Sequence, residues 1–526
     1  MIKEPLFQNN ITSQMYSNLH NYFSEGNWFY SICLIFLSLI TLASLLKKYQ
    51  KENCWRLNFN YKEENISIIS KLTFGFALIT YASILFSLEA SLFNNYDLMS
   101  PFTTKIFEKG AFPYFGNDGR LNPLGNFDTS IIYAITHNYN IINFYIFAQT
   151  LFIIYLLYKF LDFLNINKRF FTLALIIICP SFLWTNNIVF PERWSTAFVI
   201  LSFIYYKKLK LIPFVVFMNL AIYSKETSVL LYSGILIYSL LENVYKENIK
   251  INSFIHPIKT MKKMPFETMI FISCLIFSLL LLCFTIEDDY LNNKKGDFSA
   301  LLSLYKIDIA INVVSLIYFI INLKNKKNNF LNSLLFSSTF FNIFIICIFQ
   351  TISAYAYKPY YLQISSIINI IYIISLSKSY KPIVFAFLAL FSYQNIYIYQ
   401  KEYGKQYREL YNFFTQEAKE KKEINIYLSD NNNTTTWPNI AISSAYKYYS
   451  PNKKITFKYN NKSYITYLMN KDFLHNTINQ DQPIINDYVV IKKNNNYQKT
   501  KKELDSIKYN KVYENNLFEV NYVKNK

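Results

Sequence analysis

Repeated apolar runs, separated by short basic loops, constrain this 526-residue chain more than any other feature of its sequence. A helix needs about 20 apolar residues to cross a bilayer, with a lower limit near 17. Two of the runs, 194–206 and 211–223, are short and would form either tilted half-crossings or one hairpin that does not cross. The sequence therefore predicts a polytopic α-helical membrane protein with about 12 transmembrane helices. The predicted spans are 27–46, 70–93, 141–163, 170–188, 194–206, 211–223, 227–245, 267–286, 307–323, 329–349, 361–377 and 381–398.

The composition agrees with a membrane protein and excludes several other classes. Hydrophobic residues make up 52% of the chain and charged residues only 17%, whereas soluble globular proteins carry about a quarter charged residues. With only 9 Gly and 14 Pro, the chain is neither collagen-like nor a linker. Its 6 cysteines show no spacing typical of a metal or redox site.

The net charge of +19 is explained by topology rather than by a nucleic-acid partner. Basic residues gather on alternate loops between the apolar runs, and cytoplasmic loops of membrane proteins carry such an excess of Lys and Arg. We therefore expect the opposite loops, and everything after residue 398, to lie outside the cytoplasm. The basic loops are 47–51, 168–169, 207–210, 259–263, 324–327 and 378–381.

Three regions follow from these patterns. Residues 1–26 form a polar N-terminal segment, expected outside the cytoplasm, and 27–398 form the transmembrane domain with a large outer loop at 94–140. Predicted strands then alternate with helices across 399–526, which indicates a small, soluble, extracytoplasmic α/β domain. The strands are expected near 424–429, 454–459, 488–492 and 510–523.

The large outer loop carries four candidate residues: Asp97, Asp118, Arg120 and Asp128. A carboxylate in a partly dry pocket can have its pKa tuned and act as a base. An arginine one residue away in a turn can bind an anion through two hydrogen bonds. The alternative is a solvated Asn-Asp-Gly turn with ordinary surface charges.

Two charged pairs stand at later outer boundaries. Glu192 and Arg193 follow Pro191 at the start of an apolar run, where charges are costly unless they are paired or face a cavity. Lys225 and Glu226 separate two apolar runs, and this lysine could bind a phosphate that the glutamate orients. The alternatives are an ion pair at a helix start and a tight turn with a local ion pair.

A tyrosine-rich segment, 355–361, occupies another outer boundary. Aromatic residues are expected there as an interfacial belt. Lys358, between Tyr355 and Tyr361, would also suit a sugar or a lipid phosphate, through stacking and charge-assisted hydrogen bonds. No residues in the sequence form a recognisable metal site.

This combination of features resembles the GT-C superfamily of membrane glycosyltransferases, whose members include protein O-mannosyltransferases and the lipid A aminoarabinose transferase. The resemblance covers an acidic first outer loop, the Pro-Glu pair at 191–192, the Lys-Glu element at 225–226, the aromatic segment 355–361 and the C-terminal α/β domain. The family often has a pair of acids directly after the helix before the loop, whereas Asp97 stands alone. The span 27–46 is an additional helix ahead of the family's first.

The resemblance implies a hexosyl or pentosyl transferase that moves a sugar from a polyprenyl-phosphate donor to a glycan, lipid or protein acceptor. Asp97 or Asp118 would be the general base of an inverting displacement. Positive side chains would neutralise the departing phosphate. The remaining candidates, Asp128, Glu192, Glu226, Tyr355 and Tyr361, would bind substrate. The reaction needs no redox cofactor, and some relatives use a divalent metal ion. The expected location is a bacterial inner membrane, with the active site outside the cytoplasm.

Three other functions remain as alternatives. A polysaccharide polymerase or ligase of the O-antigen type also has many helices, but it would favour an outer loop rich in Arg and His. A transporter or flippase would predict inverted repeats and charged residues in mid-membrane. A non-catalytic scaffold would only display the C-terminal domain. This sequence shows neither the outer loop rich in Arg and His nor the inverted repeats and mid-membrane charges, so it favours the transferase over the polymerase and the transporter.

Overall fold

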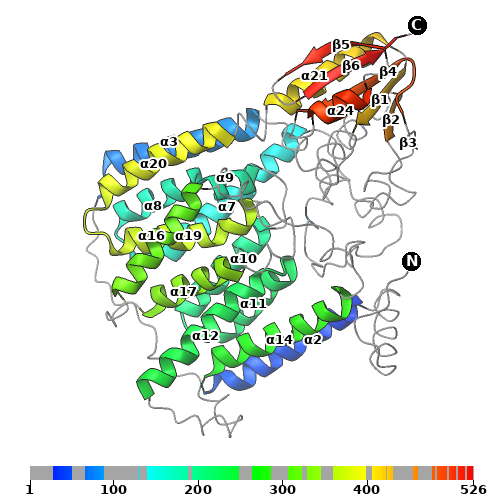
Figure 1. Ribbon diagram of the computed structural model, residues 1–526. Coiled ribbons are helices and arrows are strands. Elements are labelled where there is room, and N and C mark those ends of the chain that lie inside the picture. Colours follow the sequence, from blue (N-terminus) through cyan, green and yellow to red (C-terminus); the bar gives the residue numbers. More distant parts are fainter. Residues whose placement is uncertain are drawn as a thin grey trace, which may run out of the picture.

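The computed structural model describes seventeen stretches of the chain, and the helical part of it is a single packed body (Figure 1). A common core of buried Leu, Ile and Phe side chains runs through this body. The described residues are 28–49, 65–87, 128, 139–187, 192–247, 264–285, 306–322, 329–344, 359–398, 405–421, 423–429, 454–459, 477–479, 482–493, 497–504, 508–515 and 518–524.

The described structure is mostly helical, as the apolar runs predict, and its long helices fall on those runs. The helices of this part are α2 (Trp28–Lys47), α3 (Ile68–Ser87), α7 (Tyr139–Phe160), the 3-10 turn η3 (Leu161–Phe163), α8 (Ile166–Ile178), α9 (Pro180–Asn187), α10 (Glu192–Lys207), α11 (Leu211–Ser224), α12 (Ser228–Glu247), α14 (Pro265–Thr285), α16 (Lys306–Asn322), α17 (Asn329–Ile343), α19 (Pro359–Leu376) and α20 (Tyr380–Ile398).

The prediction of twelve spans is not supported by the described helices. Two stretches, Ile68–Phe86 and Asn143–Phe163, are long and apolar enough to cross a bilayer. A third is the pair Ile166–Ile178 and Pro180–Asn186, bent by 65°, if the pair counts as one span. The bend arises because Pro180 has no backbone N–H to continue the helix. α10 and α11 have 16 and 14 residues, fewer than a straight crossing requires.

Large apolar side chains cover part of the outside of the helical body. Ile68 is 74% exposed, Leu72 68% and Phe144 65%. Soluble proteins rarely expose contiguous apolar surface of this kind, because water penalises it. The exposed groups lie on helices α2, α3 and α7 among others, so these helices present an apolar exterior.

Contacts between loops place several predicted basic segments at one end of the helical body. Lys168 Nζ donates to the Ser377 carbonyl at 2.9 Å, which joins the start of α8 to the turn between α19 and α20. Lys207, at the end of α10, forms an ion pair with Asp162 in η3. The basic loops 168–169, 207–210 and 378–381 therefore gather at the same end, opposite the first turn of α10.

α12 and α17 meet at a glycine, which gives a testable packing prediction. A Cβ on Gly234 would lie 2.7 Å from Ser337 Cα, too close for either backbone to stay in place. Gly234→Ala should therefore destabilise the protein by about 1–3 kcal/mol. Thermal unfolding in mild detergent measures this loss.

Gly75 offers the matched control for that variant. It lies within α3, and nothing lies within 4 Å of the position that its Cβ would take. Gly75→Ala should leave stability unchanged or raise it by up to about 1 kcal/mol, because alanine is the better helix former. Equal melting temperatures for the two variants would contradict the close packing of α12 on α17.

A six-stranded sheet follows the helical body, where the sequence predicts an α/β domain. Its strand order is β3-β2-β1-β4-β6-β5. β1 is parallel to β2 and β4, and β2 is parallel to β3. β6 is antiparallel to both β4 and β5. The strands are β1 (Glu423–Ser429), β2 (Lys454–Tyr459), β3 (Thr477–Asn479), β4 (Asp487–Lys492), β5 (Tyr509–Glu514) and β6 (Phe518–Val523).

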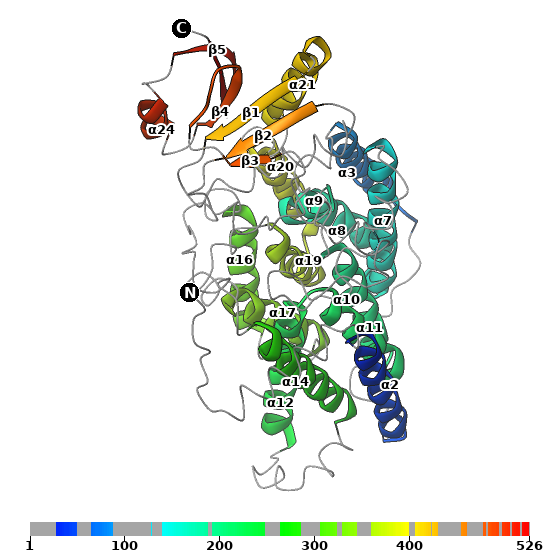
Figure 2. The same ribbon diagram turned by 90° about the vertical axis from the view of Figure 1, so that its right-hand side faces the viewer.

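Two helices cover opposite faces of this sheet (Figure 2). On one face α21 (Lys405–Glu420) packs Phe414 against the ring of Tyr488. On the other, α24 (Tyr497–Leu504) packs Tyr497 on a cluster that contains Val489. Successive residues of a strand point to opposite faces of the sheet. The neighbours Tyr488 and Val489 of β4 therefore face different helices.

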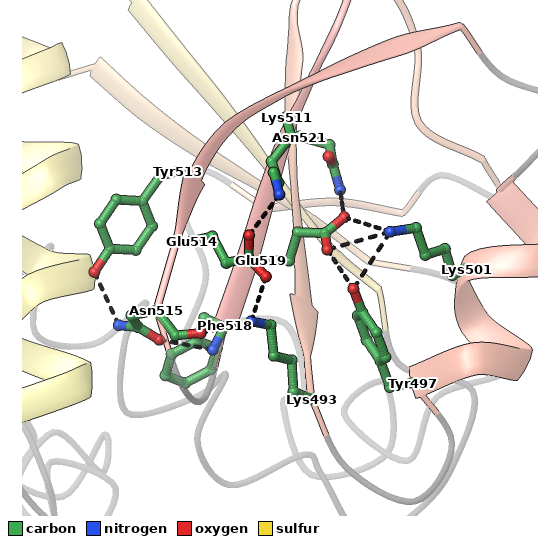
Figure 3. Close-up of polar contacts among 10 residues, drawn as sticks. All are labelled: Lys493, Tyr497, Lys501, Lys511, Tyr513, Glu514, Asn515, Phe518, Glu519 and Asn521. Atoms are coloured by element: carbon green, nitrogen blue, oxygen red, sulfur yellow. Dashed lines mark hydrogen bonds and ion pairs between the residues drawn. The ribbon is translucent and has the colours of Figure 1, made fainter.

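Charged contacts join β6 to α24, and join β5 to Lys493 directly after β4 (Figure 3). Glu514 accepts hydrogen bonds from Lys493 at 2.6 Å and Lys511 at 2.5 Å, which lower its pKa to about 2. Burial acts to raise the pKa of Glu519. The hydrogen bond from Tyr497 and its other polar partners outweigh burial, so this pKa is lowered too. Both carboxylates are therefore stabilised in their ionised form by folding.

This arrangement predicts acid sensitivity of the β5–β6 hairpin. A carboxylate whose pKa is lowered by folding stabilises the fold above its ordinary pKa, here 4.5. That contribution is lost as the pH falls from 4.5 toward 2. Hydrogen exchange of residues 508–524 in the full chain, corrected for intrinsic rates, should show protection falling over this window. In Glu514→Gln the fall should be smaller, and an identical fall would contradict the assignment.

Candidate functional site

A buried ion pair joins the first turn of α10 to the break between α11 and α12. Lys225 Nζ lies 2.9 Å from Glu192 Oε1 and 3.6 Å from Glu226 Oε1. Glu192 is 5% exposed and Lys225 3%. α11 ends at Ser224, and Lys225 takes an extended conformation that interrupts the helical path. The lysine therefore contacts a carboxylate on a different helix as well as its sequence neighbour.

Hydroxyl groups hold the same helix ends together. Ser195, one turn into α10, lies 2.8 Å from Ser228 at the start of α12, oxygen to oxygen. The Ser195 hydroxyl also approaches the carbonyl of Ala221, near the end of α11, at 3.4 Å. The first turns of α10 and α12 and the last turn of α11 thus form one rigid junction around the Glu192–Lys225 pair.

Arg193 stands next to this ion pair and is the most unusual residue of the site. It is 1% exposed, yet it has no ion pair with any described residue. Its Nε and Nη1 atoms are buried without a hydrogen-bond partner. Burying a polar group without a partner costs free energy, and a buried charge costs more. Most buried polar groups in proteins are satisfied, so two nitrogens of this guanidinium are free to bond a group that the described residues do not supply.

Asp128 lies near this arginine and is held by α7. Its Oδ2 accepts hydrogen bonds from Tyr145 Oη at 2.5 Å and from Gln149 Nε2 at 3.0 Å. Tyr145 and Gln149 lie four residues apart, so they share one face of α7. The charge of Arg193 is close enough to influence the Tyr145 hydroxyl. Asp128 is therefore a buried carboxylate held by two side chains of one α7 face.

A second tyrosine extends the cluster to α3 and α9. Tyr81 Oη lies 2.8 Å from Thr150 Oγ1 of α7 and donates to the Asn186 carbonyl of α9 at 3.0 Å. The charge of Arg193 also reaches this hydroxyl. Helices α3, α7 and α9 thus contribute tyrosine hydroxyls and amides to the cluster that includes Arg193 of α10.

The structure brings together five of the residues that the sequence singles out. Glu192, Lys225 and Glu226 share ion pairs, while Arg193 and Asp128 are linked through Tyr145. The predicted local ion pair at 225–226 is present, but Lys225 is closer to Glu192, which sequence proximity does not suggest. Tyr361 lies in the first turn of α19, and its side chain is outside the described residues, as are Asp97, Asp118, Arg120, Tyr355 and Lys358.

Several residues of the cluster are absent from the sequence-based set. Tyr81, Tyr145, Gln149 and Asn186 are uncharged and lie inside or beside apolar runs, where they do not stand out. The available signal is the i, i+4 spacing of Tyr145 and Gln149 on one helix face. Within the stretches that the structure describes, no group of three or more His, Cys, Asp or Glu side chains could hold a metal ion.

Comparison with known proteins adds no relative to this picture. No model of a protein family matches the chain, and a search of the curated proteins finds no match either. What the chain does must therefore follow from its own residues.

Proposed function

We propose that this chain is a membrane glycosyltransferase that moves a sugar from a polyprenyl-phosphate donor to an acceptor outside the cytoplasm. The observation that carries the proposal is the buried guanidinium of Arg193, whose Nε and Nη1 have no hydrogen-bond partner and which has no ion pair with a described residue. An anion that entered this cluster would satisfy the free nitrogens and would be held by charge-assisted hydrogen bonds. The apolar exterior of α2, α3 and α7 supports placing the anion on a lipid.

In this proposal the helical body lies in the bilayer, with its shorter helices tilted, bent or packed inside it. The helix ends that carry Glu192, Arg193 and Lys225 face the extracytoplasmic side, and the basic loops at the opposite end face the cytoplasm. The isoprenoid tail lies against the apolar helices, which leaves its phosphate at the level of α10's first turn. The C-terminal sheet lies outside the cytoplasm.

The proposed reaction is a single displacement with inversion. Asp97 or Asp118 takes the proton from an acceptor hydroxyl, and the oxygen attacks the anomeric carbon of the sugar. The bond from that carbon to the phosphate oxygen breaks, and polyprenyl phosphate leaves with one more negative charge. Arg193 stabilises this added charge, an interaction that is stronger in the transition state than before it.

The other charged residues determine the net charge around the leaving phosphate. Asp128, Glu192, Arg193, Lys225 and Glu226 carry three negative and two positive charges. The proposal therefore needs Arg120 and Lys358, from the outer loops, to bring further positive charge to the phosphate. Tyr355 and Tyr361 would stack on the sugar. Glu192 and Glu226 hold Lys225 in place and keep its position fixed.

The test of this function uses cells whose own copy of the gene is removed and replaced by variants. Asp97→Asn and Asp118→Asn are scored separately for surface glycan and for accumulated lipid-linked sugar. One of the two should reduce transfer about 10²- to 10⁴-fold, since it removes the general base. Asp289→Asn, in another outer loop, is the matched control. Full activity of both variants at normal protein abundance would refute the proposed mechanism.

A further inference from the structure

Gln363, in the first turns of α19, is a buried polar side chain whose amide has no hydrogen-bond partner. It is 0% exposed, and neither Oε1 nor Nε2 has a hydrogen-bond partner. A side-chain amide offers acceptor and donor groups together, and it carries no charge. Both functions of this amide are thus buried and unused.

The other polar side chains of α19 that the structure describes are satisfied, which makes Gln363 the exception among them. Ser365 Oγ donates to the Leu362 carbonyl at 2.9 Å. Asn369 donates its amide to Asn312 of α16, and Tyr372 Oη donates to Asn332 of α17 at 3.2 Å. The surroundings of α19 therefore supply partners for its other buried polar groups. A methionine at position 363 would need no hydrogen-bond partner.

The helix that carries Gln363 is connected through α9 to the helices of the Arg193 cluster. α19 packs along α9, and α9 also contacts α7 and α10 (Figures 1 and 2). Asn186, at the end of α9, has a buried Oδ1 without a partner, and so does Gln149 of α7 through its Oε1. Unused amide groups thus lie on α7, α9 and α19, and α9 contacts both of the others as well as α10, which carries Arg193.

We infer that Gln363 binds hydroxyl groups of the sugar carried by the lipid donor and so selects which sugar is transferred; this inference rests on the proposed function. A neutral amide matches a pair of neighbouring hydroxyls, one of which donates while the other accepts. The sugar is bonded directly to the phosphate that Arg193 binds, so its hydroxyls lie next to that cation. A site built to bond a hydroxyl discriminates strongly against ligands that lack it, because its polar groups are then left unpaired.

The test measures binding to the purified full-length protein in detergent. The probes are polyprenyl phosphate alone and polyprenyl phosphates that carry glucose, mannose, galactose or arabinose. The wild type should bind at least one glycosylated probe more tightly than the bare phosphate. Gln363→Met should lose this preference about tenfold, bind the bare phosphate as the wild type does, and melt at the same or a higher temperature. Ser365→Ala, also buried on α19, should keep the preference.

The outcomes separate this inference from the proposed function. If the wild type binds the bare phosphate but prefers no glycosylated probe, the role of Gln363 is wrong while the lipid-phosphate site stands. If Gln363→Met keeps the preference, or loses affinity for every probe together with stability, the residue is structural and the inference is overturned. If the wild type binds no probe at all, the proposed function fails, and this inference fails with it.

Discussion

Methionine in place of Arg193 is expected to weaken binding of the lipid phosphate while leaving the protein as stable as before or more stable. Both effects have one cause, the buried guanidinium without an ion-pair partner among the described residues. Hydrogen bonds to a charged group contribute about 1.5–3 kcal/mol, so affinity for polyprenyl phosphate should fall roughly 10- to 150-fold. Transfer should fall further, by about 10²- to 10³-fold, because the leaving phosphate gains charge in the transition state.

The stability half of this prediction separates a ligand-binding arginine from a structural one. A buried charge that is replaced by an apolar side chain of similar size is often neutral or stabilising by about 1–4 kcal/mol. Arg169→Met is the matched control, since Arg169 donates to the Leu164 carbonyl at 3.3 Å and lies over the Tyr158 ring. The control should keep its affinity for the lipid. A large drop in melting temperature for Arg193→Met would contradict the account.

The second large effect is expected at the Glu192–Lys225 ion pair. Lys225→Met leaves Glu192 and Glu226 buried or half-buried without the ammonium group between them. Breaking a buried pair from one side costs about 3–5 kcal/mol, because an uncompensated charge remains. Glu192→Gln should cost less, since Lys225 keeps Glu226 at 3.6 Å. Thermal unfolding in mild detergent gives the order of the two losses.

A double variant isolates the pair. Glu192→Gln combined with Lys225→Met removes both charges, so the protein should recover part of the stability that Lys225→Met loses. The junction of α10, α11 and α12 remains held by Ser195 and Ser228. Wild-type stability of Lys225→Met alone would show that the pair contributes nothing to the fold.

The helices could be predicted from the sequence because their signal is local. A run of apolar residues fixes where a helix forms, and α12 and α14 lie where 227–245 and 267–286 predict them. The break at Pro180 also had a local signal, since proline interrupts a helix wherever it falls in one. The number of crossings could not be predicted in this way, because it depends on helix length and bending as well as on apolar character.

The site could be predicted only in part, because its contacts are not local. Charge at an outer boundary marked Glu192, Arg193 and Lys225, but not that Lys225 pairs with a residue 33 positions earlier. Nor does any pattern tell a satisfied arginine from an unsatisfied one, since that depends on which helices pack beside it. Gln363 gave no signal at all, as a single amide in an apolar run is usually bonded within the protein.

The most direct test of the account is the release of polyprenyl phosphate from a lipid-linked sugar by the purified full-length protein in lipid nanodiscs. With an acceptor extract from the source cells, the wild type should release polyprenyl phosphate and transfer the sugar in equal amounts. Arg193→Met should release it at least about 100-fold more slowly. Wild-type protein that binds the donor but releases no polyprenyl phosphate, or an Arg193→Met variant with undiminished release, would contradict the account.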